Sequence, residues 1–165
     1  MSASDRSRDP ATPFWREAAV AGAVGAATIA VWFLALDVLR GRPLYTPTVL
    51  GTALVRGPGL ASPETLPISV GMVLLFTFVH GVVFVALGGV ACGLIRLAEK
   101  NANYGFGLIL FFVFLLCGFL FVAMLFAEDV LRALAWPAIL VGNLLAVAAM
   151  ALYLRPRHPG VLMLP

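Results

Sequence analysis

The sequence predicts an all-α integral membrane protein in which four transmembrane helices form a bundle. Of its 165 residues, 62% are hydrophobic and 12% are charged, and the mean hydropathy is +1.02. Soluble domains are about 45–50% apolar and about 25% charged, and a chain this small cannot bury so much apolar surface in a water-soluble core. Four apolar segments are long enough to cross a bilayer, which takes about 20 residues. We expect these helices near residues 18–39, 68–97, 104–126 and 133–154.

The first apolar segment is expected to be a retained anchor helix within a membrane domain of residues 14–158. Its polar leader contains acids and runs through Glu17, and no small-residue cleavage site follows, so it does not resemble a cleaved signal peptide. Residues 1–13 are polar and mixed in charge, as is typical of a disordered tail, and residues 159–165 form a short C-terminal tail. Near the far end of this helix, Asp37 stands three residues before Arg40, which predicts a local ion pair.

The long connection between the first two helices predicts a short helix in the outer interface, either interfacial or re-entrant. Thr46-Pro47 is typical of a helix start, with threonine as the N-cap and proline in the first helical position. Arg56-Gly57 is typical of a helix end. Such a helix could act as an apolar lid over the bundle or as a docking surface for a partner.

The basic residues predict the orientation of the bundle. With four crossings, both termini share one side with the turn between the second and third helices. That side carries Arg6, Arg8, Arg16, Arg96, Lys100, Arg155 and Arg157, and the opposite side carries Arg40, Arg42, Arg56 and Arg132. The positive-inside rule then places both termini in the cytoplasm. The bases are scattered at helix ends without interleaved aromatic residues, so we expect contact with lipid and not with nucleic acid.

A polar set at mid-depth is the strongest candidate site. His80 stands near the middle of the second apolar segment, on a face rich in small residues, and intramembrane ionisable groups almost always face the bundle interior. Thr28, Cys117 and Asn143 come out at a similar depth on the other helices. Small residues that would let the helices approach closely are Ala21, Gly25, Gly81, Gly88, Ala138, Gly142 and Ala146.

Three interpretations of His80 remain open. In the first, the imidazole simply hydrogen-bonds to a neighbouring helix, with Thr28 or Asn143 as the partner. In the second, it binds the metal of a haem or a bacteriochlorophyll, beside glycines that leave room for a flat ring. In the third, the midplane passes ions or a small substrate, which is poorly supported because no charged residue lies deep in any helix.

The sequence contains no motif for catalysis or for a dedicated metal site. It has no zinc-protease, serine-hydrolase or phosphate-loop signature. Its two cysteines, Cys92 and Cys117, are expected at depths roughly 12 Å apart, beyond disulfide reach. We therefore expect a protein that is not an enzyme and has no assured cofactor.

Three stretches, "DVLRGRPLYTPTVLGTAL", "TFVHG" and "LAWPAILVGNLLAVAAMALYLRPRHP", resemble a group of small, uncharacterised bacterial membrane proteins with four helices. The resemblance implies a bacterial inner membrane location and assigns no activity. The small-residue faces and the phenylalanine-rich third segment favour packing against other chains. The resulting hypothesis is a non-catalytic accessory subunit of a larger inner-membrane assembly, such as a respiratory or photosynthetic complex. The alternatives are a tetrapyrrole carrier through His80 and a small transporter or channel.

Overall fold

The structure, a computed structural model, describes residues 13–57, 65–100 and 136–158. These ranges are helical and contain no strand. Their elements are α1 (Phe14–Leu39), α2 (Tyr45–Arg56), α3 (Val70–Lys100), α6 (Trp136–Leu154) and the short 3₁₀ helix η3 (Arg155–Arg157). Three spans within them, namely α1, α3 and Pro137–Arg157, are long and apolar enough to cross a membrane. The all-α class with three candidate membrane-spanning helices is therefore confirmed for the described residues, while the helix expected near residues 104–126 lies outside them.

The observed helix ends differ from the expected ones in a way that matters for the polar residues. The first helix begins at Phe14, so Glu17 lies in its first turn and not in a polar leader. The next long helix continues to Lys100, which places Glu99 in its last turn. Hydropathy cannot find these turns, because a helix continues through polar residues wherever its backbone hydrogen bonds can still form.

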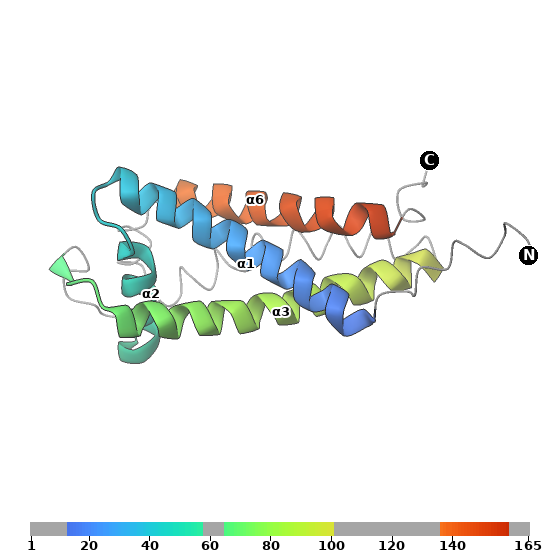
Figure 1. The fold of residues 1–165 in the computed structure, drawn as a ribbon, viewed down its shortest axis with the longest axis horizontal. Helices are drawn as coiled ribbons and strands as arrows, with labels where there is room; N and C mark the ends of the chain where they lie inside the picture. Colours follow the sequence, from blue (N-terminus) through green and yellow to red (C-terminus); the bar gives the residue numbers. More distant parts are fainter. Residues whose placement is uncertain (1–12, 58–64, 101–135, 159–165) are drawn as a thin grey trace, which may run out of the picture.

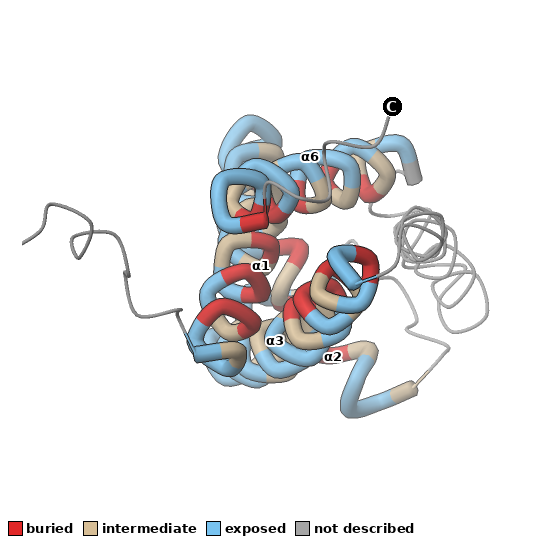
Figure 2. The backbone as a smooth tube through the Cα atoms, turned by 90° about the vertical axis from the view of Figure 1, so that its right-hand side faces the viewer, coloured by how far each residue is buried: buried red, intermediate tan, exposed pale blue. Residues whose placement is uncertain are grey.

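Helix α1 lies between α3 and α6 and packs against both of them (Figure 1). Its N-terminal end meets the C-terminal ends of α3 and α6, and at the opposite end α2 runs across the bundle (Figure 1). The buried residues of the three long helices turn toward one another, and exposed residues cover their outer sides (Figure 2). Buried Tyr45 and Val49 of α2 pack with Ile139 of α6, so α2 forms an apolar lid over this end.

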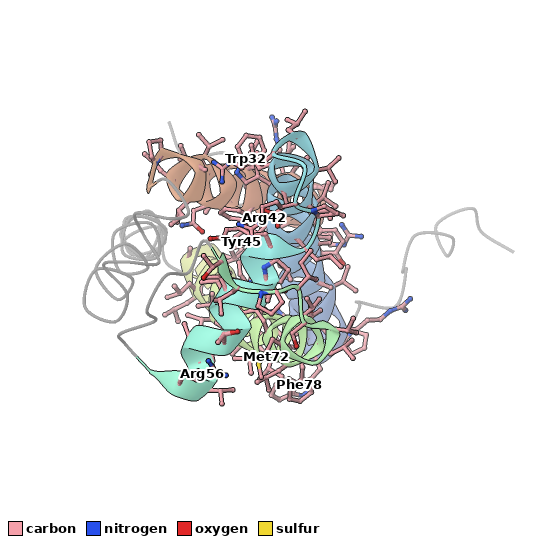
Figure 3. The ribbon with its side chains drawn as sticks, turned by 90° about the vertical axis from the view of Figure 1, so that its left-hand side faces the viewer. Trp32, Arg42, Tyr45, Arg56, Met72 and Phe78 are labelled. Carbon is pink, nitrogen blue, oxygen red and sulfur yellow. The ribbon has the colours of Figure 1, made fainter. Side chains whose placement is uncertain are left out.

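Glycines allow the closest helix contacts. A Cβ atom built at Gly22 of α1 would lie 2.6 Å from Val85 Cα of α3, and one built at Gly88 of α3 would lie 2.7 Å from Gly22 N. Both distances are well below van der Waals contact, so only glycine permits this crossing. At the lid, a Cβ at Gly51 would lie 2.8 Å from the backbone carbonyl carbon of Met72 in α3; Figure 3 labels Met72 beside α2.

Asp37 holds the connection between α1 and α2 in place. Its carboxylate binds Thr46 and does not form the expected ion pair with Arg40. Asp37 is completely buried. One carboxylate oxygen accepts the backbone N–H of Thr46 at 2.7 Å, and the other accepts the Thr46 hydroxyl at 2.7 Å. The expected N-cap, Thr46, lies inside the first turn of α2, whose N-cap residue is Leu44 in a left-handed conformation with φ 67°. Asp37, which belongs to α1, therefore accepts a backbone N–H from the first turn of α2. It takes the place of a capping side chain next to that helix.

Candidate functional site

The four residues expected at mid-depth do not form one hydrogen-bonded cluster in the described structure. The Thr28 hydroxyl donates to Val24 O of its own helix at 2.8 Å, and the His80 ring bonds to α1 through the main chain. The side-chain nitrogen of Asn143 is buried without a hydrogen-bond partner among the described residues. Cys117 lies outside the described residues.

His80 joins α3 to α1 through a backbone carbonyl. Its Nε2 lies 3.4 Å from Ala26 O. The ring therefore bonds to a backbone carbonyl of α1 and not to Thr28 or Asn143, the two partners that the sequence suggested. The ring stacks with Phe76 at a centroid distance of 5.3 Å and meets Phe84 in a tilted arrangement at 4.6 Å; each phenylalanine lies one helical turn away on either side. A metal on Nε2 would have to stand where the Ala26 carbonyl stands, so this geometry does not favour tetrapyrrole ligation through that nitrogen.

Most of the small residues that we expected at helix contacts are buried in the structure. Ala21, Gly25, Gly88, Gly142 and Ala146 are buried. Ala138 is half-buried and uses its carbonyl, which accepts the Trp32 indole N–H at 2.8 Å. A Cβ at Gly81 would meet no described atom within 4 Å, so its packing role stays a prediction.

Trp32 connects α1 to α6. Beyond its hydrogen bond to Ala138 O, its indole lies against Gly142, where a Cβ would stand 2.9 Å from Trp32 Cδ1. Figure 3 shows Trp32 near the α6 ribbon at the lid end of the bundle. The small residue on α6 thus accommodates a large ring from α1.

The densest polar site in the described structure lies at the end opposite the lid. Glu17 of α1 is only 3% exposed. One of its oxygens accepts Arg96 Nη2 of α3 at 3.1 Å, and the other accepts His158 Nε2 at 2.7 Å. The second ring nitrogen, His158 Nδ1, lies 2.8 Å from Glu99 Oε1 of α3. We call these four residues, Glu17, Arg96, Glu99 and His158, the terminal ionic cluster.

This cluster links three elements through charge. His158 follows η3 directly and is itself buried, and Leu154, four residues earlier in the chain, belongs to the apolar cluster with Ala21, Ala91 and Ile95. A buried carboxylate is tolerated only when it is paired and hydrogen-bonded, and removing one partner of such a group typically costs about 3–5 kcal/mol. The cluster therefore holds the first turn of α1, the last turns of α3 and the end of α6 together.

Sequence reasoning missed the terminal ionic cluster because it assigned Glu17 to a polar leader and Arg96 to the basic residues at helix ends, without pairing either with a residue distant in the sequence. The available signal was topological: Glu17, Arg96, Glu99 and His158 all fall on the same side of the membrane when the spans are placed in order. Opposite charges gathered at one end of a small bundle indicate pairing. His158 reaches Glu17 from the residue directly after the 3₁₀ turn, and no local sequence pattern predicts this contact.

The remaining chemistry of the described residues is limited. They contain no group of three or more His, Cys, Asp or Glu side chains arranged to hold a metal ion. Cys92 is a free, buried cysteine. The chain matches no known protein family, no curated protein and no solved structure.

Proposed function

We propose that the protein is a small, non-catalytic accessory subunit of a larger membrane assembly. The observation that carries this proposal is how the described helices divide their polar and apolar side chains. The buried carboxylates Glu17 and Asp37 are both bound within the protein, at opposite ends of α1. What the helices offer outward is a broad apolar exterior.

The exterior is apolar on all three long helices. Val31 of α1 is 66% exposed, Phe78 of α3 is 71% exposed and Leu152 of α6 is 69% exposed; Figure 3 labels Phe78 at the edge of the bundle. In a bilayer such surfaces face lipid or other membrane helices. A preorganised bundle with an apolar exterior suits a packing role in an assembly.

The same proposal includes the location of the protein in the bacterial inner membrane and its orientation there. The N-terminal end of α1 and the end of α6 meet in the terminal ionic cluster, which supports placing both of them on one side of the bilayer. The excess of basic residues on that side supports a cytoplasmic placement. The resemblance to small bacterial membrane proteins supports the bacterial inner membrane as the location.

Native mass spectrometry of the gently extracted protein tests the proposal. A subunit should appear in a particle much heavier than the 17.5 kDa chain, together with companion chains. A bare chain or a simple homo-oligomer would refute it. Any tightly bound pigment would appear in the same spectrum as additional mass.

Photo-crosslinking from matched positions identifies the contacting face. A photoreactive amino acid is placed in turn at Val31, Phe78 and Leu152, which have similar exposure on three different helices. In an assembly, at least one of these positions should give adducts with another protein, whereas a lipid-facing position gives lipid adducts only. Lipid adducts alone from all three positions would argue against docking through the described helices.

A further inference from the structure

We infer that His158 is a proton-controlled latch, which holds the end of α6 against α1 and α3 only while both of its ring nitrogens carry protons. This inference concerns the fold itself and does not depend on the proposed subunit role. It rests on the position of one buried imidazole between two carboxylates that belong to different helices.

The geometry places the ring as a bridge. His158 is 8% exposed. Its Nε2 lies 2.7 Å from Glu17 Oε1 and its Nδ1 lies 2.8 Å from Glu99 Oε1. Glu17 belongs to the first turn of α1 and Glu99 to the end of α3, so a single side chain ties the segment after α6 to two other helices.

While Glu17 and Glu99 are both ionised, the two bonds together require the doubly protonated ring. An ionised carboxylate can only accept hydrogen bonds, and a neutral imidazole has one N–H and one lone pair. With both protons present, the ring donates to Glu17 and to Glu99 and carries a positive charge between them. When one proton is lost to solvent, one of the two carboxylates faces a lone pair, and that contact becomes repulsive.

The Glu99 contact is the one that should open. Glu17 is buried and also accepts Arg96 on its second oxygen at 3.1 Å, so it has no access to water but keeps a cationic partner. The Glu99 side chain is 33% exposed, and among the described residues only His158 hydrogen-bonds to it. Glu99 can therefore exchange the ring for water at low cost.

The neighbouring cations keep their charge while the ring changes. Arg96 is bound to Glu17, and Arg157 donates to Tyr153 O at 2.6 Å, with its guanidinium 3.9 Å from the Tyr153 ring centroid. The other described charged residues near this end are Arg16, Lys100 and Arg155, all exposed. Arginine is effectively always protonated, so the ring of His158 is the group in the cluster that switches its donors.

The test measures the ring and the chain end in the same sample. Full-length protein in nanodiscs of uncharged lipid carries ¹⁵N-labelled histidine and the His80→Phe change, which leaves His158 as the single histidine because the chain has two. A nitroxide on Arg157→Cys, with Cys92 and Cys117 replaced by alanine, reports the mobility of the chain beside the latch.

Both ring nitrogens should be protonated at low pH, with the nitroxide immobilised. As pH rises, loss of the ring proton and release of the nitroxide should share one midpoint. The ratio of mobile to immobile label should rise about tenfold or more, as expected for the loss of one charge-assisted hydrogen bond.

The control is His158→Asn, which is neutral at every pH and should leave the nitroxide mobile throughout. A pH-dependent release that persists in this variant would overturn the inference, because another group would then control it. A ring that loses its proton without any release would also overturn it. A ring that keeps both protons until the protein unfolds would make His158 a permanent strut and not a latch.

Discussion

Replacing Gly88 by alanine should destabilise the bundle, although alanine is the better helix former. A Cβ at this position would lie 2.7 Å from Gly22 N and 3.1 Å from Gly22 Cα, and it would also meet Ala18 O. These atoms belong to the backbone of α1 and cannot rotate away. Because carbon atoms at optimal separation lie about 3.5–4.0 Å apart, α1 would have to retreat by about 1 Å. Overpacking of this kind typically costs about 1–3 kcal/mol.

The matched control lies five residues further along the same helix. Gly93 is exposed, and a Cβ there would meet no described atom within 4 Å, so Gly93→Ala should gain about 0.5–1 kcal/mol from helix propensity alone. The free energy of unfolding in micelles, followed by circular dichroism during denaturant titration, should therefore be about 1–3 kcal/mol lower for Gly88→Ala than for Gly93→Ala. Equal stability of the two variants would refute the close crossing of α1 and α3.

Three further substitutions test the polar contacts of the bundle through the same unfolding measurement. Asp37→Ala removes two short hydrogen bonds at the start of α2 and should cost about 2–3 kcal/mol; a loss below about 0.5 kcal/mol would contradict the capping role. Trp32→Phe removes one interhelical hydrogen bond and should cost about 1 kcal/mol, whereas Trp15→Phe, at a residue that is 79% exposed, should cost almost nothing. His80→Phe keeps an aromatic ring in the stack and should cost only about 0.6 kcal/mol, the average for an interhelical hydrogen bond in a membrane; a much larger loss would show that the imidazole does more than join α3 to α1.

The spanning helices could be predicted from the sequence because their signal is local. A run of about 20 apolar residues is the length that a helix needs to cross a bilayer, so such a run indicates a membrane-spanning helix. The lid helix could also be predicted, since Thr46-Pro47 and Arg56-Gly57 mark its ends through backbone preferences. The expected N-cap, Thr46, was wrong by two residues, because the turn before α2 places Leu44 in a left-handed conformation and brings in a carboxylate from α1.

The polar contacts could be predicted only in part, because their partners lie far apart in the sequence. For Asp37, Arg40 was the plausible local partner, yet the carboxylate bonds to Thr46 across a turn. The partner of His80 is a backbone carbonyl, and every helix offers many of these, so no pattern of side chains identifies it. The contacts of His158 could not be predicted, because they depend on the 3₁₀ turn that follows α6.

Helix α1 carries polar ties at both of its ends, and these ties determine its register. Glu17 binds the ends of α3 and α6, and Asp37 binds the start of the lid. Between them, Gly22 meets α3 at a contact that only glycine permits. Sliding α1 by one helical turn, about 5.4 Å, would break both ties and bring larger side chains to the crossing. The described helices should therefore hold one arrangement, and the partner proposed above would have to fit the apolar exterior as it stands. Docking would then bury apolar surface without disturbing either tie.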